Sequence, residues 1–136
     1  VMFENYNLKL DIESKTMADL CQIFILPACY TYQTKVAQNI HALQKIGVPE
    51  SGYKAQYELL QDLTQHINLV STKVNELEQE IENAHHQSDF EAVAYAFCHK
   101  VKPLMAEIRT SVDHLEGKVE DNVWPLAKYR EMMFIR

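Results

Sequence analysis

Three pairs of side chains have residue types and spacings that suit metal binding or catalysis. Glu82 and His85 form a single E-x-x-H, which places a carboxylate and an imidazole on one face of a helix. Di-iron bundles use this motif twice and add two further Glu residues. The second copy is absent here, and His85 is followed by His86 at the expected end of a helix. A solvated helix terminus therefore explains this pair better than a metal site.

The other two pairs are also better explained without a reaction. Asp62 and His66 lie four positions apart and could share a metal ion, but one more pair of ligands would be needed, so a local hydrogen bond or surface ion pair is the simpler interpretation. Cys98 and His99 are adjacent, so on a helix they point about 100° apart and cannot act directly as nucleophile and base. The motifs GxxxxGK[ST], GxGxxG, HExxH and GxSxG do not occur. We therefore predict no catalytic, cofactor-binding or metal-binding residue.

The composition predicts an all-α fold. A chain of 136 residues suits one domain spanning residues 1–136. Hydrophobic residues make up 47% of it and charged residues 24%, as in an ordinary globular protein. With only three Gly and four Pro, the chain has too few turn-forming residues for an all-β fold. Long elements joined by few connections are expected.

Breaks in the hydrophobic pattern divide the chain into three helices at about 12–46, 52–84 and 89–122, followed by a tail at 123–136. Ser14 or Thr16 is a candidate cap for the first helix. The second and third helices carry apolar residues at alternating spacings of three and four. In the second helix these are Leu60, Leu63, Ile67, Val70, Val74, Leu77, Ile81 and Ala84, and in the third Phe90, Ala94, Phe97, Val101, Leu104, Ile108, Val112, Leu115 and Val119. Such seams predict lengthwise packing.

Two prolines lie inside these helices. Pro27 and Pro103 each remove one backbone hydrogen bond, and because the periodicity continues past both, we expect each to bend its helix rather than end it. The alternative is two shorter helices at each proline. Three long helices with short connections favour an up-down-up antiparallel bundle with a C-terminal aromatic tail.

Charge and cysteine content exclude several partners. A net charge of −6 with scattered basic residues argues against binding to nucleic acid or an anionic membrane surface. The most apolar window, "LCQIFILPACY", is shorter than the roughly 20 residues that span a bilayer, and no signal peptide precedes it. Three cysteines without a CxxC are typical of a reducing compartment. A cytoplasmic location is expected.

The first helix and the tail carry more apolar surface than a three-helix bundle can cover. Ile23, Ile25 and Leu26, together with their neighbours, wrap nearly the whole circumference of the first helix, so we expect a further covering element. The tail combines aromatic and basic residues of the kind that anchor protein interfaces, although it could instead fold back on its own bundle. The predicted interface residues are Ile23, Ile25, Leu26, Trp124, Pro125, Tyr129, Arg130 and Phe134.

Three stretches resemble one enzyme family. "WPLAKYREMMF" is similar to the C-terminal signature of type III glutamine synthetases, W-P-L-x-K-Y-R-E followed by a hydrophobic residue. "IESKTMADLCQIFILPACYTYQ" resembles the start of their helical C-terminal region, and "FCHKVKPLMAEIRTSVDHLEGKVEDNVWPL" resembles the stretch between. The three occur in the same order and cover nearly all of the chain. Ala127, where a second proline is often found, is a small departure.

The resemblance implies a non-catalytic C-terminal helical domain of a larger enzyme. The parent would ligate ammonia to glutamate using ATP and a divalent metal, Mg or Mn, in a catalytic domain absent from this chain. None of the family's ATP-binding or metal-binding residues matches a position here. The implied partners are the parent's catalytic domain and neighbouring subunits of a homo-oligomer. The alternatives are a free-standing helical adaptor, a metal- or haem-binding bundle, and a domain that senses a metabolite or binds a regulator.

Overall fold

The structure, a computed structural model, describes residues 2–126, with side chains described from residue 8 onward. Within that range every regular element is helical and no strand occurs, which confirms the all-α prediction. The α-helices are α1 (Met2–Leu20), α2 (Leu26–Lys45), α3 (Lys54–His85), α4 (Phe90–Ala96) and α5 (Lys102–Lys118).

Two π-helical turns join these segments into three long helices. Cys21–Ile25 connects α1 to α2, and Phe97–Val101 connects α4 to α5. A proline follows one residue after the next segment begins in both cases, at Pro27 and Pro103. The wider π turn carries its hydrogen bond over five residues, as from the Leu26 N–H to the Cys21 carbonyl. The chain therefore remains helical across both prolines.

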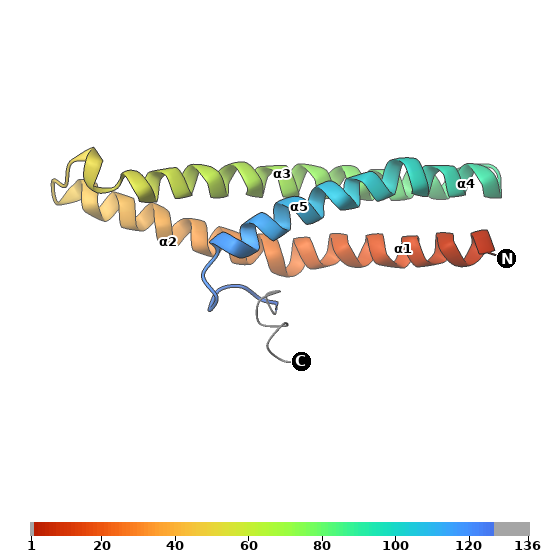
Figure 1. Cartoon of the computed structure of the whole chain (residues 1–136), viewed down its shortest axis with the longest axis horizontal. Helices are drawn as coiled ribbons and strands as arrows, with labels where there is room; N and C mark the ends of the chain where they lie inside the picture. Colours follow the sequence, from red (N-terminus) through yellow and green to blue (C-terminus); the bar gives the residue numbers. More distant parts are fainter. Residues whose placement is uncertain (1, 127–136) are drawn as a thin grey trace.

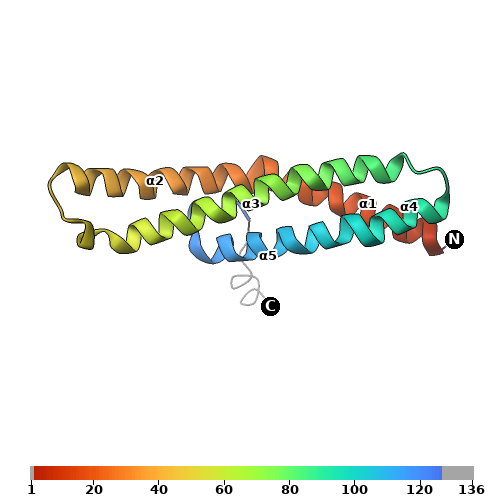
Figure 2. The same ribbon diagram turned by 90° about the horizontal axis from the view of Figure 1, so that it is seen from above.

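The three long helices lie side by side in an elongated bundle (Figures 1 and 2). The chain turns back at one end, between α2 and α3, and again at the other end, between α3 and α4. The helix α3 occupies the central place, since it contacts α1, α2, α4 and α5. The helix α5 ends partway along the bundle, so the far parts of α2 and α3 extend beyond it as a pair.

The predicted seams form the core. In α3 every seam residue from Leu63 to Ala84 is buried, and Leu60 is half-buried. The seam of the third long helix is buried at Phe97, Val101, Ile108 and Leu115, whereas Phe90 at its beginning is exposed. In α3 the spacing of buried residues thus alternates between four and three, and in the third long helix the half-buried Leu104 and Val112 fill the seven-residue gaps, as lengthwise helix packing requires.

Local signals define two of the helix ends. Past the end of α2, Gly47 has a φ of +88°, a conformation that costs glycine little. Its N–H donates to the Gln44 carbonyl, and the Val48 N–H donates to the Leu43 carbonyl, which together form a Schellman motif. At the start of α4, Asp89 accepts a hydrogen bond from the Ala92 N–H at 2.8 Å. This is an N-cap and fixes where the third helix begins.

Two helix boundaries differ from the prediction. The first helix begins at Met2 instead of near residue 12, and Ser14 is buried inside it, where its hydroxyl donates to the Asp11 carbonyl at 3.0 Å instead of capping. A serine bonded to the preceding turn is compatible with a continuing helix. The third helix ends at Lys118 and not at 122, because Val119 adopts an extended backbone (φ −77°, ψ 140°).

Candidate functional site

A cluster of three side chains joins α3 to α5. The His114 Nε2–H of α5 donates to Asp62 Oδ2 of α3 at 2.6 Å. His66, one turn along α3, faces the other carboxylate oxygen, with 3.7 Å between His66 Nε2 and Asp62 Oδ1. The two imidazole rings stack with their centroids 4.0 Å apart. Two nitrogen ligands and one carboxylate thus converge, with one ligand atom from each residue lying within 4.8 Å of the others.

The positions of the two histidines in the heptad repeats of α3 and α5 explain why they meet. His66 directly precedes the buried seam residue Ile67, and His114 directly precedes the buried seam residue Leu115, so each histidine lies at the edge of a buried seam. All three side chains are partly exposed, at 31% for Asp62, 22% for His66 and 36% for His114. The sequence analysis considered Asp62 and His66 and interpreted them as a local hydrogen bond or surface ion pair. It did not connect His114 to them, because His114 is 52 positions away from Asp62 in the chain. The position of His114 beside the seam was the signal that could have found it.

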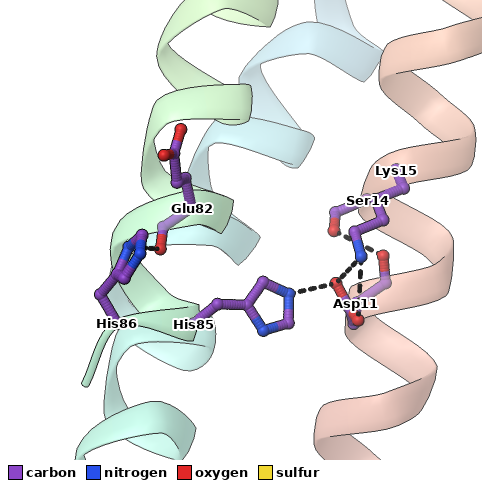
Figure 3. A network of polar contacts seen from close by, with 6 residues as sticks. All are labelled: Asp11, Ser14, Lys15, Glu82, His85 and His86. Carbon is purple, nitrogen blue, oxygen red and sulfur yellow. Dashed lines mark hydrogen bonds and ion pairs between the residues drawn. The ribbon is translucent and has the colours of Figure 1, made fainter. Parts of the chain in front are cut away.

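The E-x-x-H pair is not brought together. His85 instead lies 2.9 Å from Asp11 of α1, measured from Nε2 to Oδ1, while Glu82 points elsewhere (Figure 3). Lys15 lies against the same carboxylate, at 3.2 Å from Asp11 Oδ1. His86 Nδ1 lies 2.9 Å from the Glu82 carbonyl oxygen, so this imidazole contacts a backbone carbonyl in the last turn of α3. This network ties α1 to the last turn of α3, with one carboxylate shared by two basic groups.

The cysteines differ in their surroundings. Cys21 and Cys29 are buried, and burial raises the pKa of each thiol to about 11. Cys98 is exposed. Its neighbour His99 packs its ring against Tyr95, with centroids 4.2 Å apart, so the Cys98–His99 pair has no catalytic arrangement. The two buried thiols act as small apolar core residues.

The predicted interface residues of the first helix separate into two groups. Ile25 and Leu26 are buried within the bundle's own core, where they are unavailable to a partner in this conformation. Ile23 is 61% exposed, and its neighbour Phe24 is also open to solvent. The first helix is therefore covered by the bundle on one side only. Its other side carries large apolar side chains in water.

The segment after α5 folds back on the bundle. Trp124 is 7% exposed and belongs to the main apolar cluster, while Pro125 is exposed. Glu120 contributes to holding this segment, since Lys35 Nζ of α2 lies 2.9 Å from Glu120 Oε2. Among the interface predictions, Tyr129, Arg130 and Phe134 lie outside the described residues.

An open groove of about 950 Å³ runs between α1 and α5. Its lining is mainly apolar and includes Ile12 and Leu20 of α1, Met105 and Val112 of α5, and Leu126 of the folded-back segment. Ile12 and Leu126 are themselves exposed. The groove therefore extends the uncovered apolar surface of the first helix toward α5.

No helix among residues 2–126 is long and apolar enough to cross a membrane. Among the described residues, Asp62, His66 and His114 form the one group of three or more potential ligands that lies close enough to hold a metal ion. The cluster of Asp62, His66 and His114 offers two nitrogen ligands, whereas an ion that bridges phosphates prefers oxygen ligands.

The described residues thus form an elongated helical bundle with polar clusters between its helices and an uncovered apolar face on its first helix. Residues 1–44 match the family model described as the glutamine synthetase C-terminal domain. The whole chain is 30% identical to a glutamine synthetase of Bacteroides fragilis (strain YCH46) and 30% identical to a type-3 glutamine synthetase of Dictyostelium discoideum. It spans 19% of the length of each of these relatives.

These matches identify the bundle as a C-terminal domain of the glutamine synthetase family. The homology indicates the type-3 members of that family.

Proposed function

We propose that this chain is a non-catalytic domain of a type III glutamine synthetase, with a structural, inter-domain or subunit-assembly role. In this proposal the parent enzyme ligates ammonia to glutamate at the expense of ATP, in the cytoplasm and as a homo-oligomer. The domain is an up-down-up antiparallel bundle with bends at Pro27 and Pro103. It packs against the catalytic domain of its own chain or against a neighbouring subunit.

The uncovered apolar face of the first helix carries this proposal. Ile12, Ile23 and Phe24 all lie on α1 or on the π turn that follows it, and all three are exposed. Exposed large apolar side chains beside a mainly apolar groove, which Ile12 also lines, are typical of a contact surface. Burying this apolar surface in an interface would stabilise the interface by about 25 cal/mol for each Å² removed from water.

The described part of the tail supports an internal role at its beginning. Trp124 packs into the bundle's own core, which supports a role in anchoring the folded-back segment. Pro125 and Leu126 follow on the surface, and Leu126 borders the groove. A contact made by the tail would therefore begin at Pro125, with Tyr129, Arg130 and Phe134 as its proposed further residues.

The size of the native polypeptide tests directly whether this chain is part of a larger enzyme. An antibody raised against this domain should detect a species about five times as long as this chain, because the chain spans 19% of its relatives. A native species of 136 residues would overturn the proposal in favour of a free-standing adaptor.

The role of the first helix is tested separately in the full-length enzyme. Ile23→Asp should reduce assembly or the docking of this domain, as measured by native mass spectrometry and limited proteolysis. Gln61→Asp is the matched control, because Gln61 is an exposed polar residue on α3. Equal assembly of both variants and of the unmodified enzyme would exclude Ile23 from the contact surface.

A further inference from the structure

We infer that Asp62, His66 and His114 bind a divalent first-row transition metal ion, for which Zn²⁺ is the representative probe. This inference does not depend on the proposed function. The site would join α3 to α5, in addition to the apolar packing that already holds them together.

The ligand set determines the class of metal. Two imidazole nitrogens and one carboxylate oxygen suit Zn²⁺ and its first-row neighbours, whereas Ca²⁺ and Mg²⁺ prefer sites made of oxygen ligands. Three protein ligands also leave at least one position of a tetrahedral ion for water. In composition the site resembles an open metal centre.

The distances allow coordination with small side-chain movements. One ligand atom from each residue lies within 4.8 Å of the other two. Two ligands at 2.0–2.2 Å on opposite sides of one ion can be at most about 4.4 Å apart, and in a tetrahedral arrangement they are closer. Three ligands of one ion cannot all lie opposite one another, and in a tetrahedral site they are about 3.4 Å apart. Atoms that are now as far as 4.8 Å apart would therefore approach one another by up to about 1.4 Å.

Without a metal ion, the hydrogen bonding among the three side chains is incomplete. Only His114 bonds to Asp62, because the 3.7 Å between His66 Nε2 and Asp62 Oδ1 is too long for a hydrogen bond. His66 Nδ1 is buried and has no hydrogen-bond partner among the described residues. A metal ion would replace the long contact by coordination through one His66 nitrogen. It would also hold the two stacked rings in a defined orientation.

The exposure of the three side chains and the rigidity of their backbones both favour metal binding. The three side chains are between 22% and 36% exposed, so an ion can enter from solvent. Their backbones are held by buried seam residues on both sides, among them Leu63, Ile67 and Leu115. Ligands fixed by packing lose little conformational freedom when they bind an ion.

The experiment is a titration of the purified chain with Co²⁺ and with Zn²⁺ after treatment with a chelator. Co²⁺ should give a visible absorption band at one equivalent, which Zn²⁺ abolishes by competition. Zn²⁺ should also raise the melting temperature, because it binds the folded state in preference. Isothermal titration calorimetry gives the affinity.

Single-ligand variants locate the site. Asp62→Asn, His66→Gln and His114→Gln should each lower the Zn²⁺ affinity by more than about tenfold. His41→Gln, which changes an exposed histidine on α2, should leave it unchanged, as should His86→Gln at the end of α3. Far-UV circular dichroism confirms that each variant is folded.

Three results would overturn the inference. The first is an unmodified chain that gives no stoichiometric Co²⁺ band. The second is a band that persists in Asp62→Asn and His114→Gln. The third is a loss of affinity in His41→Gln or His86→Gln equal to that in the ligand variants, since this would indicate weak binding by surface histidines only.

Discussion

His114 and Asp62 connect α5 to α3 through a 2.6 Å hydrogen bond between residues 52 positions apart in the sequence. The bond lies beside the buried seam formed by Leu63 and Leu115. A polar contact next to the core fixes the relative position of the two helices, because sliding either helix by one turn would break it. The pair thus contributes specificity to a packing that apolar side chains alone leave less defined.

Replacing Asp62 tests the energetic role of this contact without metal. In the presence of a chelator, Asp62→Ala should lower the free energy of unfolding by about 1 kcal/mol, because a partly exposed, charge-assisted hydrogen bond is lost. Urea denaturation followed by circular dichroism measures the change. The control is Asp19→Ala, which changes an exposed carboxylate on α1. An unchanged midpoint for Asp62→Ala would show that the contact is energetically neutral.

Trp124 offers a spectroscopic test of the folded-back segment, since it is the single tryptophan of the chain. Because Trp124 is 7% exposed, its fluorescence maximum should be blue-shifted in the native protein and move to longer wavelength in denaturant. Trp124→Ala should lower the free energy of unfolding by about 3 kcal/mol, as expected for a buried aromatic side chain. A native spectrum like that of free tryptophan would contradict the burial.

Thiol reactivity should separate the three cysteines. With a maleimide at neutral pH, Cys98 should react quickly, whereas Cys21 and Cys29 should react only as fast as the protein opens, because both are buried. Mass spectrometry of timed samples counts the modified sites. The variant Cys98→Ser should show no fast phase. A second fast thiol in that variant would contradict the burial of Cys21 or Cys29.

The same two thiols predict a loss of stability at alkaline pH. Burial raises the pKa of Cys21 and Cys29 from 9.0 to about 11, so between these values the unfolded chain loses protons that the folded chain retains. The contribution of the thiols is therefore complete below pH 9 and is lost as the pH rises toward 11. Urea midpoints measured from pH 8 upward should fall less steeply in Cys21→Ala than in the unmodified chain.

Gly47 is the position where the backbone itself limits substitution. Its φ of +88° favours glycine, and Gly47→Ala should destabilise the protein by about 1 kcal/mol although the added methyl group would meet no atom within 4 Å. Gly117→Ala is the matched control, because that glycine also has open space but lies within α5 and has no positive φ. The control should be neutral or slightly stabilising. Thermal unfolding compares the two variants.

Sequence reasoning predicted the helical class and the buried seams well, because both follow from periodicity. Leu63 through Ala84 have the phase of a packed helix whichever partner covers them. The start of the first helix was missed because Ser14 is a good cap by type, yet in the structure its hydroxyl bonds to the preceding turn. The partner of His85 could not be predicted either, since Asp11 is 74 positions away and only the packed bundle brings them together.

The apolar residues from Leu20 to Cys29 show a further limit of periodicity. Their number correctly suggested more apolar surface than one stripe. Ile25 continues the buried line of Ala18 and Cys21, whereas Ile23, two positions earlier, lies on nearly the opposite face and is exposed. The number of apolar residues alone did not show which of them the rest of the bundle covers.

The two π turns also lie at comparable places, each inside one long helix and just before a proline. Cys21–Ile25 separates α1 from α2, and Phe97–Val101 separates α4 from α5. The first and last residues of each turn are buried, and the buried line of each long helix continues through the turn. An insertion or deletion of one residue in either turn would therefore rotate the second half of that long helix away from the core.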